Sequence, residues 1–236
     1  MRALRRLPRP LVMLALFVGS LFITWSSLVY FNDDEYAPFV LEKLPLAREE
    51  LFLFALKVHV VAAALALPGC LLLVSMAVLK RFPRFHRWLG RVTGVAVLFA
   101  LLPSGFYLSL FAKGGLPSTL GFMATGAIMG VGMVQGVRTA RAGRFVEHRR
   151  WVLHVLAQMG VAVLSRAMLF GFDAAGVEEI PAYLVSLWLP VVGCAVFVEV
   201  LSARSTPVVP RRNHHEAPVA ALHPHPGQPV LRGAAG

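Results

Sequence analysis

The sequence predicts an all-α integral membrane protein, a bundle of six transmembrane helices whose two termini both face the cytoplasm. The first reason is a series of apolar runs of about 20 residues, the length an α-helix needs to cross a hydrocarbon core about 30 Å thick. The second is that only 15% of the 236 residues are charged, whereas soluble domains carry about 25%. The third is how lysine and arginine are distributed between the runs. The predicted spans are residues 11–31, 51–79, 92–112, 116–137, 151–172 and 182–203.

Three parts are expected along the chain. Residues 1–31 hold a basic segment and the first transmembrane helix, residues 51–203 form a five-helix membrane core, and residues 204–236 form a disordered cytoplasmic tail. The first apolar run exceeds the 7–15 residues of a signal-peptide core and lacks a small-residue cleavage site before Asn32, so we expect a helix that is retained. The tail is rich in proline and poor in apolar residues, which is typical of disorder. Its histidines fit a polar tail better than a weak metal site.

The charges predict which side of the membrane each connection occupies. With the N-terminus in the cytoplasm, cytoplasmic segments contain 18 of the 23 lysine and arginine residues. The opposite side contains nine of the twelve acidic residues. Such an excess of basic residues in short loops marks the cytoplasmic side of a membrane protein. We therefore expect a multi-pass protein of the bacterial inner (cytoplasmic) membrane.

Composition also argues against other classes of protein. The net charge of +11 does not indicate nucleic-acid binding, because the charges lie between apolar runs and not on one soluble face. Cys70 and Cys194 both lie inside apolar runs, so neither a disulfide framework nor zinc-ligand spacing is present. The chain has no Gly-x-Ser-x-Gly, Walker or His-Glu-x-x-His pattern, which argues against hydrolytic catalysis. No catalytic residue and no metal ligand is predicted.

Two basic turns separate the central spans. One is Phe85-His86-Arg87-Trp88-Leu89-Gly90-Arg91 and the other begins Glu147-His148-Arg149-Arg150-Trp151. Histidine, arginine and tryptophan together are typical of the membrane interface, where they contact lipid headgroups. Anionic headgroups are the expected partners of four arginines, Arg87, Arg91, Arg149 and Arg150.

Placing an ionisable side chain inside a bilayer costs several kcal/mol of free energy, so such residues usually have a polar partner or a function. Five lie within the predicted spans: Lys57, His59, His154, Arg166 and Glu199. His59 and Arg166 lie at similar depth near the outer ends of their helices, so we expect them to share one site. A buried arginine favours an anionic or carbonyl oxygen: a carboxylate, a haem propionate, a lipid phosphate or a quinone carbonyl. Asp173 is the only acid near that depth, and Glu199 is expected to pair with Arg204.

A second group of histidines lies toward the cytoplasmic side. It comprises His86, His148 and His154. Haem b needs paired imidazoles at equal depth on facing helices, and His86 with His154 is the most suitable pair. The fifth predicted span carries polar residues on two neighbouring faces, which places it at the centre of the bundle.

These residues resemble a known family. His59, the turn His86-Arg87-Trp88-x-Gly90-Arg91, the turn His148-Arg149-Arg150-Trp151 and Arg166 are similar to the bacterial membrane-protein family catalogued as domain of unknown function 2306 (DUF2306), over roughly residues 55–170. The resemblance implies a fold and a motif set and no particular reaction. A looser similarity to six-helix di-haem cytochromes b is incomplete here, because the fourth predicted span has no histidine.

The sequence therefore leaves three functions open. The first is a redox or ligand-binding bundle with haem b or a quinone at His59, His86, His148, His154 and Arg166. The second is a non-enzymatic membrane protein whose basic turns bind anionic lipid or a protein partner. The third is a small-molecule transporter, for which the prolines within the spans are the indication.

Overall fold

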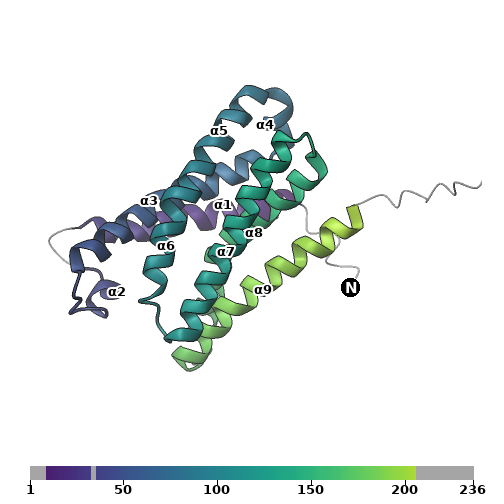
Figure 1. Ribbon diagram of the computed structural model, residues 1–236. Helices are drawn as coiled ribbons and strands as arrows, with labels where there is room; N and C mark the ends of the chain where they lie inside the picture. The colour runs from purple at the N-terminus through teal and green to yellow at the C-terminus, as the bar shows by residue number, and fades with distance from the viewer. Residues whose placement is uncertain (1–8, 33–35, 206–236) are drawn as a thin grey trace, which may run out of the picture. The chain divides into compact units, whose positions relative to one another are not determined.

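The computed structural model describes residues 9–32 and 36–205, and every regular element in these ranges is helical. Six helices are long and apolar enough to cross a membrane. This confirms the all-α, six-span prediction (Figure 1). Residues 206–236, most of the predicted tail, lie outside the described residues. The elements are α1 (Arg9–Ser26), η2 (Ser27–Phe31), α2 (Pro38–Leu41), α3 (Glu49–Val74), α4 (Met76–Arg81), α5 (Pro83–Ala96), η3 (Val97–Leu101), α6 (Leu102–Ser109), α7 (Leu116–Arg141), α8 (Phe145–Ala174) and α9 (Glu179–Ser205).

The connections gather at two ends of the bundle. The end with the α4–α5 and α7–α8 turns is called the basic face, and the end with α2 and the α6–α7 and α8–α9 turns is called the acidic face. Lys113 joins three connections at the acidic face through ion pairs with Glu42 and Glu179. Tight reversal of the chain requires glycine in the left-handed region at Gly143 (φ 71°) and Gly176 (φ 70°). Alternating loops therefore lie together, as the charge pattern predicted.

The first basic turn differs from the prediction because it is itself helical. We expected the span to continue to Leu79 and a loop to follow through Arg91. Instead α3 ends at Val74, and α4 and α5 contain most of the basic residues. The break falls at Phe82 because Pro83 disfavours helical geometry in the residue before it and suits the first turn of the next helix. Hydropathy marks where the hydrocarbon ends and not where the helix ends.

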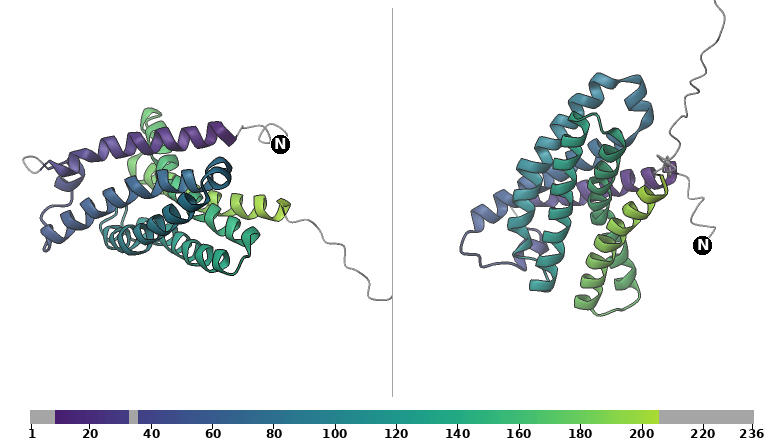
Figure 2. Two further views of the ribbon diagram at one scale, coloured as in Figure 1. Left: turned by 90° about the horizontal axis from the view of Figure 1, so that it is seen from above. Right: turned by 45° about the vertical axis from the view of Figure 1, so that its right-hand side comes forward.

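Helix α8 lies at the centre of the bundle. It packs against α1, α3, α7 and α9, which confirms the central place predicted for the fifth span. Figure 2 shows α7, α8 and α9 side by side, with α1 crossing beside them. Close approach of α7 to its neighbours depends on small residues: a Cβ on Gly132 would lie 3.1 Å from the Trp151 carbonyl oxygen of α8. The α7–α8 contact is therefore set by backbone proximity.

The main buried cluster lies between α3, η3, α7 and α8 and includes Ala66, Cys70, Val97, Met129 and Val155. The outer surfaces of the spans carry exposed aromatic and aliphatic side chains, such as Trp25 and Phe99. In a bilayer such side chains face lipid tails, which are as apolar as the core itself. Apolar residues therefore cover both sides of each helix.

Candidate functional site

The outer site is built around Arg166 on α8, close to the acidic face. Its guanidinium donates to the carbonyl oxygen of Ala162, one turn earlier, at 3.1 Å. Within residues 9–32 and 36–205 it makes no ion pair with a carboxylate. It lies within electrostatic range of His59 on α3, Tyr30 in η2 and Tyr183 on α9. Four elements distant in sequence thus place polar groups within electrostatic range of one guanidinium, and a shared site of His59 and Arg166 stays a prediction.

His59 is held in a defined orientation by α6. The Ser104 hydroxyl donates to the carbonyl oxygen of Ala100 at 2.6 Å, so its oxygen is free to accept. His59 Nδ1 lies 3.3 Å from that oxygen and within reach of the Leu101 carbonyl. A proton on Nδ1 satisfies these contacts and leaves the Nε2 lone pair free. Gly105 makes room for the ring, since a Cβ there would lie 3.1 Å from His59 Cε1.

The wall of this site contains a turn of π-helix, η3. Pro103 has no N–H for the usual bond to the carbonyl of Phe99, four residues earlier. The ladder widens instead, and the Leu102 N–H donates to the Val97 carbonyl, five residues earlier. Single π-turns of this kind often occur at functional sites. Here the widened turn presents the Leu101 carbonyl to His59.

A shallow, half-open cavity of about 520 Å³ lies beside Arg166 between the ends of α8 and α9. Asp173, the acid predicted at this depth, lines the same cavity without bonding to Arg166. The lining residues are Arg166, Leu169, Phe170, Asp173, Val177, Glu179 and Ala182. The cavity therefore combines one unpaired guanidinium with apolar walls and an acidic rim.

The inner cluster joins α8 to α9 near the basic face. Glu199 accepts from Arg150 Nη2 at 2.6 Å and from Arg150 Nε at 3.2 Å, and its Oε1 lies 2.7 Å from His154 Nε2. The predicted pairing of Glu199 with Arg204 is wrong. Arg150 and His154 lie one turn apart on α8 and both point to α9, whereas Arg204 shares a helix with Glu199 and forms no ion pair with it.

The histidines proposed as a haem pair are not brought together. His154 Nε2 is occupied by Glu199, and His86 lies within electrostatic range of His148 instead. His148 Nδ1 lies 2.8 Å from the Gly136 carbonyl oxygen. Among the described residues no three His, Cys, Asp or Glu side chains converge as metal ligands. The residues present do not fit a haem b held between His86 and His154.

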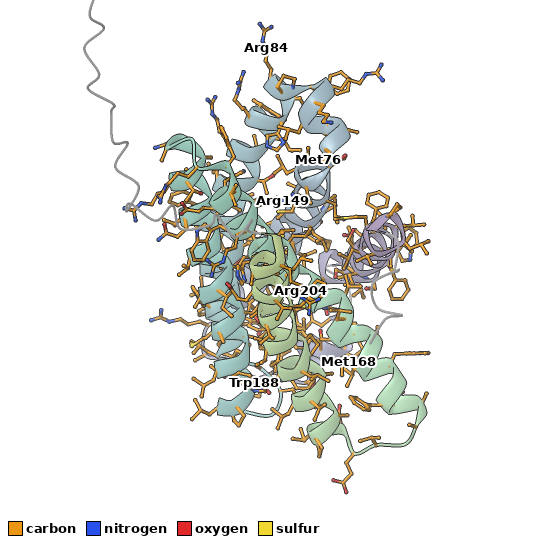
Figure 3. The ribbon with its side chains drawn as sticks, turned by 90° about the vertical axis from the view of Figure 1, so that its right-hand side faces the viewer. Met76, Arg84, Arg149, Met168, Trp188 and Arg204 are labelled. Atoms are coloured by element: carbon orange, nitrogen blue, oxygen red, sulfur yellow. The ribbon has the colours of Figure 1, made fainter. Side chains whose placement is uncertain are left out.

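The arginines of the basic turns differ in their contacts. Arg150 is bonded to Glu199 and lies over the Trp151 ring. The other three, Arg87, Arg91 and Arg149, are exposed. Figure 3 shows Arg84 projecting from the basic face, far from Trp188 toward the other end. Three of the four arginines assigned to lipid therefore remain available to headgroups, and Arg150 is committed to the protein.

Several residues of the outer site were missed from the sequence. Tyr30 and Tyr183 lie near span ends, where tyrosine is common as an interface anchor, so nothing distinguished them. Ser104 and Gly105 follow Pro103, and that proline inside an apolar run was the available signal. A proline next to serine and glycine within a span is typical of a locally altered helix.

No curated protein and no solved structure matches the chain. Residues 56–202 match the family described as Predicted membrane protein (DUF2306). The match covers more than half of the chain and reaches beyond Arg166 into α9, so it includes Glu199 as well as the five candidate histidine and arginine residues. The chain belongs to the DUF2306 family of predicted membrane proteins.

Proposed function

We propose that the chain is a ligand-binding membrane protein whose outer site takes the carbonyl or anionic oxygen of an amphiphile, with a quinone as the ligand. The observation that carries this proposal is Arg166. It lines a cavity of about 520 Å³ and has no carboxylate partner among the described residues. Arg166 donates to one backbone carbonyl, that of Ala162, but a guanidinium in a membrane is costly without a counter-charge or further acceptors, and an oxygen-bearing ligand supplies one.

The groups around Arg166 match the two ends of such a headgroup. Arg166 and the hydroxyls of Tyr30 and Tyr183 supply hydrogen-bond donors, which a quinone carbonyl accepts. His59 supplies a neutral imidazole whose Nε2 lone pair accepts a hydrogen bond from a quinol hydroxyl. Phe170, exposed on the outer surface of α8, offers an apolar wall to the isoprenoid tail. The site therefore suits a molecule that enters from the lipid.

Titration calorimetry with a short-chain benzoquinone tests this proposal, using the full chain in nanodiscs of neutral phosphatidylcholine. A hydrogen bond to a charged group contributes about 1.5–3 kcal/mol, so Arg166→Leu should weaken binding by roughly 10- to 100-fold. Arg141→Leu is the matched control, since Arg141 is exposed at the other end of the bundle. Circular dichroism checks that both variants keep their helix content. Equal affinity in wild type and Arg166→Leu would remove the basis of the proposal.

A second candidate function is the binding of anionic lipid at the basic face. It is favoured by Arg87, Arg91 and Arg149, which are exposed and make no ion pair in the described ranges, and by Trp88 beside them, which is 57% exposed. Each such residue near an anionic surface contributes about 1 kcal/mol. Replacing all three by Gln should reduce retention of phosphatidylglycerol during native mass spectrometry. Unchanged lipid retention would contradict this assignment.

The same charges support a location in the bacterial inner membrane with the basic face in the cytoplasm. Reporter fusions test this orientation. A fluorescent protein that folds only in the cytoplasm should be active when fused after α9, and alkaline phosphatase should be active when inserted between α8 and α9. The opposite pattern of activity would overturn the orientation.

A further inference from the structure

Two buried polar atoms lie one helical turn apart on α8 without a partner. The side chain of His154 is 6% exposed, and its Nδ1 has no hydrogen-bond partner among the described residues. Gln158, four residues on, is 1% exposed, and its Oε1 is also unpartnered. Residues four apart lie on the same face of a helix. Buried polar atoms in proteins are nearly always satisfied, so these two call for a shared explanation.

The neighbours of His154 fix its proton. Glu199 accepts two hydrogen bonds from Arg150, which favours the ionised carboxylate. A carboxylate only accepts, so the contact of 2.7 Å requires the proton of neutral His154 to lie on Nε2. The lone pair of neutral His154 is therefore on Nδ1. That lone pair is an acceptor enclosed in the bundle.

The neighbours of Gln158 fix its amide in the same way. Its Nε2 donates to the Val191 carbonyl oxygen of α9 at 3.2 Å. This bond fixes the orientation of the amide, so the unpartnered atom is the oxygen Oε1, an acceptor. Neutral His154 and Gln158 thus present two acceptors and no donor. One water molecule satisfies both, because it donates two hydrogen atoms.

We propose that His154 Nδ1 and Gln158 Oε1 form a binding site for one water molecule inside the bundle, which donates a hydrogen bond to each of them. Glu199 on α9 fixes the tautomer of His154, and Arg150 on α8 is the other charged group of the cluster. Helix α7 contributes no charge at the contact, since Gly132 lies against His154 there. This proposal does not depend on ligand binding at Arg166.

Nitrogen-15 NMR of histidine-labelled full chain in lipid nanodiscs tests the proposal. The signal lost in His154→Gln assigns the residue. We expect the proton on Nε2, none on Nδ1, and magnetisation transfer between Nδ1 and a bound water molecule. A proton on Nδ1, or no contact between Nδ1 and water, would overturn the proposal.

Variants of the neighbours separate this proposal from a purely structural role. In Glu199→Ala the preference for the Nε2–H tautomer should disappear, giving a mixture of both tautomers. In Gln158→Leu the tautomer should remain, while the contact between Nδ1 and water, seen as magnetisation transfer, should be lost. Glu147→Ala is the matched control, because Glu147 pairs only with exposed Arg144. If His154→Gln does not fold, the response to Glu199→Ala assigns the signal. A tautomer unchanged in Glu199→Ala contradicts the proposal.

Discussion

Replacing Glu199 by Ala tests the inner cluster through the stability of the fold. Glu199 holds the buried imidazole of His154 and the half-exposed guanidinium of Arg150. The substitution removes both interactions while leaving α9 a good helix former at that position. The resulting loss of stability therefore measures what the carboxylate contributes between α8 and α9.

The expected magnitude follows from the burial of the two partners. A buried donor left without an acceptor costs about 1–3 kcal/mol, and the His154 Nε2–H is such a donor. Arg150 is 44% exposed and can be rehydrated, so its loss adds at most about 1 kcal/mol. We expect Glu199→Ala to lower the free energy of unfolding by about 1–4 kcal/mol.

The assay is unfolding by sodium dodecyl sulfate in mixed micelles, followed by circular dichroism. Glu147→Ala is the control, because its partner Arg144 is exposed at the same face and exposed helix pairs contribute about 0.2–0.5 kcal/mol. Glu199→Gln should lie between the two, since an amide oxygen still accepts from His154. If Glu199→Ala and Glu147→Ala lose the same stability, the burial argument is refuted.

Two further predictions concern packing and pH. Gly121→Ala should destabilise the bundle by about 1–3 kcal/mol, because the added Cβ would lie 2.7 Å from a methyl group of buried Leu187. Gly193→Ala is the control and should leave stability unchanged, because Gly193 has open space around it. The same unfolding titration with sodium dodecyl sulfate measures both variants. At the acidic face, the hydrogen bond from Lys113 lowers the pKa of Glu42, and hydrogen bonds to Glu179 first and Glu42 second raise the pKa of Lys113. The stability that ionised Glu42 contributes is therefore complete above the unfolded-state pKa of Glu42 and is lost as the pH falls through its folded-state pKa. The stability that charged Lys113 contributes is complete below the unfolded-state pKa of Lys113 and is lost as the pH rises through its folded-state pKa. Unfolding of Lys113→Met against wild type across pH should show a difference that is constant near neutrality and shrinks at both extremes.

The sequence predicted the features that depend on depth in the membrane. Apolar runs of sufficient length gave the six spans, and alternation of charge placed the two basic turns at one end. The shared site of His59 and Arg166 stays a prediction, which rests on both residues lying near the outer ends of their helices. The polar residues on two faces of the fifth span correctly predicted its central place.

Features that depend on the rotation of a helix were not predictable. The depths of Glu199, His154 and Arg150 were known, but depth does not state which side of a helix faces its neighbour. Pairing of Glu199 with Arg204 was therefore expected, and pairing with α8 was found. Hydrophobic periodicity gives little help, because lipid-facing and buried surfaces of a membrane helix are both apolar.

The boundaries of the basic turns were missed for a related reason. The charged residues from Lys80 to Arg87 end the apolar run of the second predicted span. Lysine and arginine are nevertheless good helix formers. The helix therefore continues into the aqueous layer, and only Ser75 and Phe82 interrupt it. Pro83 set the break at Phe82 and Gly143 set the reversal between α7 and α8, whereas the charges decided neither.

Photoaffinity labelling tests most directly the claim that Arg166 centres a ligand site at the acidic face. An azido-quinone should label the ends of α8 and α9 that line the cavity, from Arg166 to Ala182, as identified by mass spectrometry of the digested chain. Excess unlabelled quinone and the Arg166→Leu substitution should each abolish that labelling. Labelling confined to α4 and α5 at the basic face, or unaffected by Arg166→Leu, would contradict the account.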